Sequence, residues 1–403
     1  MVYQIPYGSG SVEFSSPQGM EVEWIEPQYG AGALDPAALI LKRLRNPIGA
    51  RPLAAQARGA RRVTIIVDDI TRPTPSRQML PPILQELDSA GVPVQGIQIV
   101  VGVGSHRKML PEEMQALVGP DIFSRYVVLN HEAREPEQLV ALGNSPRRIP
   151  VRLNRQILES DLCIITGFIK PHNVAGYSGG YKGYFPATAG LETIVGVHAL
   201  QQLPGEPCRV GEIDNPFRIE VDAMGAMVPT PTFILNVIIN CRKQIVDAFA
   251  GHPMKAHRAA VAETEKRATV GVMRAAPIVV ASGGGYPSDI SLYQGINALA
   301  SVVRLRDPLV EPNGHVILMG EFREGLGSEF LGGGRHKDLG TAWASHLRKM
   351  GRLTVVSANV PREKLEEAGI RKADTLEDAI GSDDGHMIIM PHAPYTVGRL
   401  NRG

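Results

Sequence analysis

Three histidines and one lysine of this 403-residue chain have side chains suited to chemistry and glycine-rich surroundings. His172, Lys182 and His198 lie within the segment 167–198, where several glycines separate them and let the backbone approach a ligand closely. His106 follows a glycine-rich turn of its own, Gly-Val-Gly-Ser. Imidazole acts as a general acid or base near neutral pH and as a metal ligand. We therefore expect the segment 167–198 to carry the active centre, although a lone loop or helical histidine is more often a satisfied structural residue.

Asp69 and Arg72 flank a tight Thr-Arg-Pro turn just after an apolar run. A guanidinium in this position could bind a carboxylate or phosphate through two hydrogen bonds, with the aspartate orienting it. In the alternative interpretation, Asp69 accepts hydrogen bonds from the turn and Arg72 points to solvent. Local spacing leaves both open.

Three familiar motifs are matched only in part. Residues 176–180 fit G-x-S-x-G, but nine residues separate Ile169 from Ser178 and no helix follows, so a serine hydrolase is disfavoured. The stretch 283–289 has three glycines without the G-K-[ST] of a P-loop. The turn before His106 lacks the third glycine of a dinucleotide-binding loop, which makes a nicotinamide-dependent dehydrogenase a poor interpretation.

Apolar runs that alternate with helical patterns indicate an α/β fold with two domains and mostly parallel sheets. The expected strands are 63–69, 97–104, 126–131, 162–169, 233–240, 277–284, 315–320, 353–359 and 386–391. One of the main expected helices begins near Ser76, and the others cover 254–271, 291–305 and 337–350. Residues 1–30 form a β-rich opening element. Ligands of parallel sheets bind beyond the carboxyl ends of the strands, so the active site is expected there.

We place the domains at 1–270, with the cofactor and acid–base residues, and at 271–403, which resembles a Rossmann fold and whose last residues could return to the first domain. The chain is too long for one compact core. Its charged side chains, 42 basic and 41 acidic, argue against a global attraction to nucleic acid or to an anionic membrane. Three cysteines without a C-x-x-C pair indicate neither a disulfide framework nor a zinc cluster. No long apolar run or signal-like start is present, so a cytoplasmic protein is expected.

Five patches together resemble the nickel-pincer lactate racemase family of 2-hydroxy acid racemases and epimerases. They are D-D-I-T-R-P-T-P at 68–75, G-S-H-R at 104–107, I-K-P-H-N-V-A-G-Y-S-G-G-Y-K at 169–182, A-G-L-E-T-I-V-G-V-H at 189–198 and G-G-Y-P-S-D-I-S-L-Y-Q at 284–294. They occur in the order of the family and span nearly the whole chain. The resemblance implies two α/β domains with the active site in the cleft between them. The third patch is the most specific.

The resemblance implies a pyridinium mononucleotide whose sulfur groups hold Ni(II) in a pincer, installed by cofactor-maturation proteins. By motif position, His198 resembles the protein ligand of the nickel, and imidazole suits that metal. His106 and His172 resemble the acid–base pair on opposite faces of the substrate. Arg72 resembles the residue that binds the substrate, and Asp69 its neighbour in the site.

Further positions resemble residues that contact the cofactor: Thr71, Gly179, Gly180, Lys182, Tyr293 and Gln294. The founding member of the family joins its lysine to the cofactor covalently, and Lys182 matches that lysine without showing whether the bond forms here. The founding member also has a lysine three residues after the matching glutamine, where this chain has Asn297. This departure leaves the 2-hydroxy acid open, although a small aliphatic one is expected. Lys170 is a further cation nearby, with a surface position as the alternative.

The implied reaction fits these residues, because the α-hydrogen of a 2-hydroxy acid is only weakly acidic and is more readily moved as hydride. An electron-poor pyridinium accepts hydride while a base takes the hydroxyl proton, and two faces require two bases. The alternative from another class is a non-catalytic protein that binds or carries a nucleotide or metallocofactor, which would need no acid–base pair.

Overall fold

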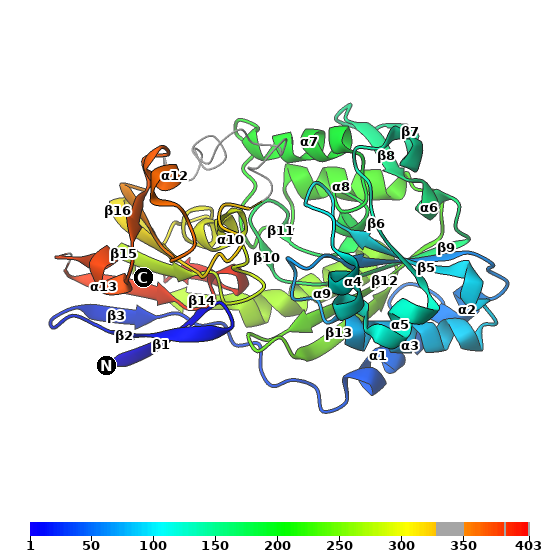
Figure 1. Cartoon of the computed structure of the whole chain (residues 1–403), viewed down its shortest axis with the longest axis horizontal. Helices are drawn as coiled ribbons and strands as arrows, with labels where there is room; N and C mark the ends of the chain where they lie inside the picture. Colours follow the sequence, from blue (N-terminus) through cyan, green and yellow to red (C-terminus); the bar gives the residue numbers. More distant parts are fainter. Residues whose placement is uncertain (328–349, 383, 402–403) are drawn as a thin grey trace.

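The computed structural model describes residues 1–327, 350–382 and 384–401, and two six-stranded sheets organise them (Figure 1). The first sheet has the order β13-β12-β9-β4-β5-β6, and all its neighbours are parallel except the β12–β13 pair. Its strands are β4 (Val63–Asp68), β5 (Ile97–Gly102), β6 (Val127–Asn130), β9 (Leu162–Phe168), β12 (Thr232–Ile239) and β13 (Ile245–Gly251). The five expected strands of this sheet are confirmed.

Both faces of the first sheet are buried, which explains why its central strands are apolar throughout. In β4, Val63, Ile65 and Val67 belong to one core cluster, and Ile66 belongs to another on the opposite face. The first cluster includes side chains of α1 (Pro36–Arg45), α2 (Leu53–Ala57) and α3 (Ser76–Ser89). The second includes side chains of α7 (Leu191–Ala199), α8 (Pro216–Ala226) and α9 (Pro253–Ala268).

The second sheet is parallel throughout, in the order β18-β17-β16-β15-β19-β3. Its strands are β3 (Glu21–Trp24), β15 (Ala276–Ser282), β16 (Val310–Met319), β17 (Arg352–Val356), β18 (Arg371–Ala373) and β19 (His386–Met390). Helix α10 (Leu292–Val303) covers one face. The expected helix 337–350 falls almost wholly outside the described residues.

The N-terminal strands pack with the second sheet. β3 pairs with β19, and the hairpin of β1 (Val2–Tyr7) and β2 (Gly10–Ser15) adds Ile5 and Phe14 to the core of the second sheet, so the first 24 residues do not belong with the first sheet (Figure 1). An edge strand taken from a distant segment leaves no local pattern in the sequence. The boundary near residue 270 stays a prediction.

The remaining elements connect or flank the sheets. They are α4 (Pro111–Val118), α5 (Pro120–Arg125), β7 (Leu139–Asn144), β8 (Pro150–Asn154), α6 (Arg155–Leu158), β10 (Pro171–His172), β11 (Gly176–Tyr177), β14 (Thr269–Val272), α12 (Arg362–Glu366), α13 (Leu376–Ile380) and β20 (Val397–Leu400). β20 pairs with β14, so the last strand joins the segment between the two sheets. Among the described residues, no helix is both long and apolar enough to cross a membrane.

Candidate active site

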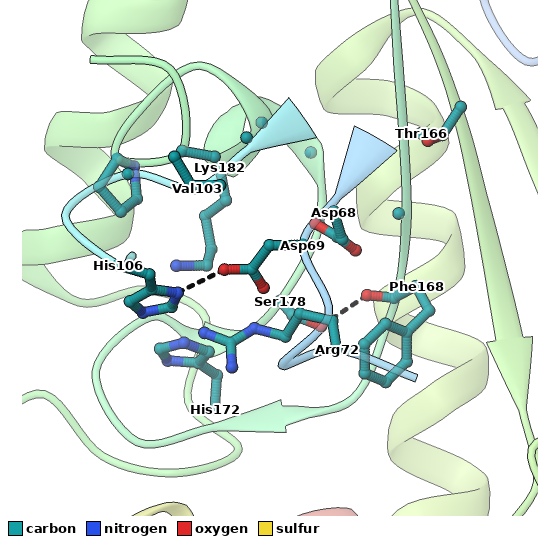
Figure 2. A pocket seen from close by; sticks show the side chains of 18 of the residues that line it. Asp68, Asp69, Arg72, Val103, His106, Thr166, Phe168, His172, Ser178 and Lys182 are labelled. Carbon is teal, nitrogen blue, oxygen red and sulfur yellow. Dashed lines mark hydrogen bonds and ion pairs between the residues drawn. The ribbon is translucent and has the colours of Figure 1, made fainter. Parts of the chain in front are cut away.

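A pocket lies at the carboxyl ends of β4, β5 and β9, where parallel strands place their loops together (Figure 2). Eight of the expected site residues line it: Asp69, Arg72, His106, His172, Gly179, Gly180, Lys182 and His198. Asn297 of α10 lines it from the second sheet. Figure 2 shows the side chains of His106, His172, Arg72 and Lys182 converging on one region.

His106 and Asp69 form a hydrogen-bonded pair, with 2.5 Å between Nδ1 of the histidine and Oδ2 of the aspartate. The other carboxylate oxygen of Asp69 accepts hydrogen bonds from the hydroxyl (2.6 Å) and the backbone N–H of Thr71. Burial by itself would raise the pKa of Asp69, but the charge and hydrogen bond of His106 outweigh it and lower that pKa to about 2. The ionised Asp69 therefore accepts the Nδ1–H of His106, which leaves Nε2 as the basic atom.

His172 carries its proton at the opposite ring position. Its Nδ1 accepts hydrogen bonds from the backbone N–H groups of Val174 (3.1 Å) and Ala175 (3.2 Å), so the hydrogen of the neutral ring is on Nε2. Burial, followed by the charges of Lys182 and other nearby cations, lowers the pKa of His172 well below its ordinary value. The pocket thus contains one imidazole that accepts a proton at Nε2 and one that presents a proton there.

Arg72 is hydrogen-bonded to helix α10, which covers the second sheet. Its Nη1 donates to Oε1 of Gln294 at 2.7 Å, although the two residues are 222 positions apart. Asn297 lies one turn further along the same helix and donates to the backbone oxygen of Gln294 at 3.0 Å. The contact with Gln294 orients the guanidinium, whose remaining donors suit a carboxylate.

Three buried side chains fix the loop that precedes Lys182. Arg218 of α8 donates to the carbonyls of Tyr177 (2.5 Å) and Gly179 (3.1 Å). Asn236 of β12 accepts from the N–H of Gly180, and His257 of α9 contacts the carbonyl of Ser178 through Nε2 at 2.8 Å. The loop is thus bound from three elements, and its backbone is fixed before any ligand arrives.

The glycines of this loop have a steric reason. Gly179 has φ +78°, and a Cβ there would lie 2.2 Å from Cδ1 of Ile169 and 2.8 Å from Oδ1 of Asn236. Gly180 has φ +63°, and its Cβ would lie 2.9 Å from the His257 ring. Only glycine lets the loop lie this close to β12 and α9.

His198 has the orientation that a metal ligand requires. Its Nδ1 lies 2.8 Å from the carbonyl oxygen of Ile194, one turn earlier in α7, so Nδ1 carries the hydrogen and Nε2 keeps its lone pair. The ring of Phe217 packs against it edge-on, with 5.3 Å between centroids. Lys182 places Nζ 5.1 Å from the centroid of the same phenylalanine ring.

The donor set fits a cofactor that brings most of the metal's ligands. Among the described residues, no group of three or more His, Cys, Asp or Glu side chains could hold a metal ion. A single imidazole with its hydrogen on Nδ1, beside a lysine and a preformed glycine loop, matches a metal carried by a bound organic group.

Two charged residues of the pocket differ from the expectations. Asp68 was not singled out, yet it lines the pocket and accepts a hydrogen bond from Thr74; burial raises its pKa, and that hydrogen bond opposes the rise. Lys170 is not on the surface but 6% exposed, and it also lines the pocket.

The other expected residues, Thr71, Tyr293 and Gln294, are not among the residues that line the pocket. Thr71 donates to Asp69, and Gln294 accepts a hydrogen bond from Arg72. The backbone N–H of Tyr293 donates to the carbonyl of Leu326. Three residues that fix the glycine loop were not expected from the sequence: Arg218, Asn236 and His257. Of these only Asn236 left a signal, as a lone polar residue inside an apolar run.

Comparisons with known proteins agree on one family. Residues 7–206 match the family model of the lactate racemase N-terminal domain. The chain is 31% identical to a lactate racemase of Thermoanaerobacterium thermosaccharolyticum over 329 residues, which are 81% of this chain and 76% of that protein. It is 30% identical to a lactate racemase of Lactiplantibacillus plantarum, over 72% of this chain and 66% of the relative.

Solved structures show the same likeness. The lactate racemase apoprotein of T. thermosaccharolyticum superposes with a TM-score of 0.82 at 28% identity, over 99% of this chain and 100% of that one. A Thermotoga maritima protein shares the fold, with a TM-score of 0.72 at 17% identity, over 92% of this chain and 100% of that one.

The fold and these relatives define an α/β isomerase of the racemase type. The chain belongs to the lactate racemase family, whose members use a nickel-containing cofactor.

Proposed function

We propose that this enzyme interconverts the two configurations of a small 2-hydroxy acid with a nickel-pincer nucleotide. The observation that carries the proposal is the pair His106 and His172, two imidazoles in one pocket with opposite proton placement. Binding or carrying a cofactor would need no such pair. The lactate racemase relatives support the same reaction type.

The residues of the pocket have different roles in this reaction. Arg72, oriented by Gln294, binds the substrate carboxylate. His106 takes the hydroxyl proton at Nε2, while Asp69 stabilises the imidazolium that forms. His172 donates a hydrogen bond from Nε2–H to the substrate oxygen from another side, and the imidazolium of His106 returns the proton when the hydroxyl re-forms. To act as the base for the opposite enantiomer, His172 must carry its hydrogen on Nδ1, and its ring must then turn away from Val174 and Ala175.

The cofactor is held by residues of the same pocket. Nε2 of His198 would hold the nickel, and Lys182 would anchor the nucleotide beside the loop of Gly179 and Gly180. When bound, the cofactor supplies an acceptor that takes the α-hydrogen of the substrate as hydride and returns it to either face. Exclusion of water keeps the ketoacid in place between these two events.

The test uses protein loaded by the cofactor-maturation proteins and a single enantiomer of lactate in deuterated water. We expect interconversion in which the α-hydrogen remains protium, because hydride moves without exchange with solvent. His106→Ala and His172→Ala should each lower kcat by about 10²–10⁴-fold. Deuterium at the α-carbon, or full activity of either variant, would contradict the mechanism. Loaded protein that keeps nickel but converts no 2-hydroxy acid would favour the alternative role as a cofactor carrier.

A further inference from the structure

Lys170 is a buried cation that the proposed mechanism does not use. It lies two residues after the end of β9, is 6% exposed, and lines the pocket together with Arg72 and His172. Its position in the chain, between a buried strand and the loop that carries His172, holds its side chain within the protein. A lysine in such a place requires partners for its ammonium group.

The partners of Lys170 are carbonyl oxygens. Nζ donates to the backbone oxygens of Pro171 (3.2 Å) and Pro394 (3.4 Å). Within the described residues it has no carboxylate partner at ion-pair distance. A buried ammonium without a counter-charge is destabilising, so the site is electrostatically incomplete as the chain alone builds it.

The charged groups that face Lys170 increase this imbalance. Arg72, from the loop after β4, and Lys243, from the turn between β12 and β13, are both cations, and His172 beside it is neutral. Asp69, the pocket acid whose pKa is lowered, is already bound by His106 and Thr71. The missing partner is therefore an anion from outside the chain.

Position 297 indicates which anion. Asn297, which lines the pocket from α10, is neutral and donates to Gln294, the partner of Arg72. We propose that Lys170, which follows β9, is the second carboxylate-binding cation of the substrate pocket. It acts together with Arg72, because α10 contributes no basic side chain. This rests on the proposed function and assigns a substrate-binding residue to it.

Binding at Lys170 is coupled to a proton. Burial, together with the charges of Arg72 and Lys243, lowers the pKa of Lys170 to about 7. A bound carboxylate favours the ammonium form and raises this pKa again. At pH 8 the substrate-free enzyme holds a largely neutral amine, and carboxylate binding then draws a proton from solution.

Calorimetric titration of the nickel-loaded enzyme tests this coupling. Racemic lactate and racemic malate serve as ligands, so that turnover makes no net heat, in two pH 8 buffers of different ionisation enthalpy. We expect proton uptake by the wild type, and loss of that uptake in Lys170→Met with roughly 10–100-fold weaker binding. Lys170→Arg, which stays charged, should bind without proton uptake. Lys266→Met is the control, because Lys266 is an exposed lysine of α9 that pairs with Glu263 outside this pocket, and this variant should keep the uptake.

The two ligands distinguish two positions of the bound carboxylate. Proton uptake with lactate means that Lys170 binds the carboxylate beside the reacting carbon. Proton uptake with malate alone means that Lys170 binds a second carboxylate. Absence of proton uptake with both ligands, or equal loss of uptake in Lys170→Met and Lys266→Met, overturns the inference. Failure of the proposed function gives a different result. The nickel-loaded wild type would then bind these acids without interconverting their enantiomers, with or without proton uptake.

Discussion

Nδ1 of His106 lies 2.5 Å from Oδ2 of Asp69, and this contact places the hydrogen of the neutral ring on Nδ1, which leaves Nε2 as its basic atom. Asp69 comes from the end of β4 and His106 from the loop after β5, two parallel neighbours in the sheet. In the proposed reaction the aspartate fixes the tautomer and the histidine moves the proton.

Replacement of Asp69 by asparagine should remove this control. The amide still fits the space, but it no longer requires a hydrogen on Nδ1, so Nε2 of His106 is not reliably the basic atom. We expect kcat to fall by about 10²–10⁴-fold with little change in the fold. Thr71→Val is the control, because it removes one hydrogen bond to the same carboxylate and should cost far less. Equal effects of the two variants would show that Asp69 acts only as a structural turn residue.

His172 should remain neutral with hydrogen on Nε2 across pH 6–8. Its pKa is lowered by burial and by nearby cations, and its Nδ1 is occupied by two backbone N–H groups. Nitrogen-15 spectra of protein with labelled histidine, assigned by comparison with His172→Gln, measure both properties. A titration midpoint near 6.5, or a hydrogen on Nδ1 as the main tautomer, would refute the assigned proton placement.

His198→Ala should abolish nickel retention by protein that has been exposed to the maturation system. The expected content falls from about one nickel per chain to near zero, while circular dichroism shows an intact fold, because α7 keeps its apolar contacts without the imidazole. His252→Ala provides a histidine control, since His252 caps α9 and lies outside the pocket lining. Nickel retained by the His198 variant would exclude the proposed ligand.

Gly179→Ala should destabilise the protein by about 2–5 kcal/mol, as the sum of backbone strain and overpacking. The added methyl meets Ile169 and Asn236 in a conformation that glycine adopts freely. Gly59→Ala isolates the backbone term, because Gly59 has φ +82° and a Cβ there would meet no atom within 4 Å. About 1–2 kcal/mol is expected for that variant. Chemical denaturation compares the two free energies of unfolding.

The pH dependence of stability reports on Lys170. Its pKa in the folded protein is about 7, below the unfolded value near 10.4, so between these values the unfolded state binds more protons. Stability therefore rises with pH from about 7 to 10, by on the order of 1 kcal/mol per pH unit from this group. Lys170→Met should remove that rise, which denaturation of the cofactor-free protein at pH 7, 8 and 9 measures. An unchanged slope would mean that Lys170 is charged and satisfied in the folded state.

Most strands of the two sheets could be predicted from sequence because a buried parallel strand needs a continuous apolar run, but β13 and β18 were not expected. The glycine-rich turns were equally visible, since their dihedral requirements are local. These two signals placed Asp69, His106 and His172 at strand ends, and so near one another. They did not place β3, because an edge strand that joins a distant sheet is specified by its partner β19 and not by its own four residues.

The amino-acid sequence was sufficient to single out the candidate side chains of the site and to place most of them at the carboxyl ends of parallel strands. Their chemical states depend on the folded chain. The tautomers of His106, His172 and His198, the hold of Gln294 on Arg72 and the burial of Lys170 beside Pro394 depend on atoms brought together by folding. Burial and hydrogen bonding across long sequence separations set proton positions and pKa values, and no local pattern encodes them.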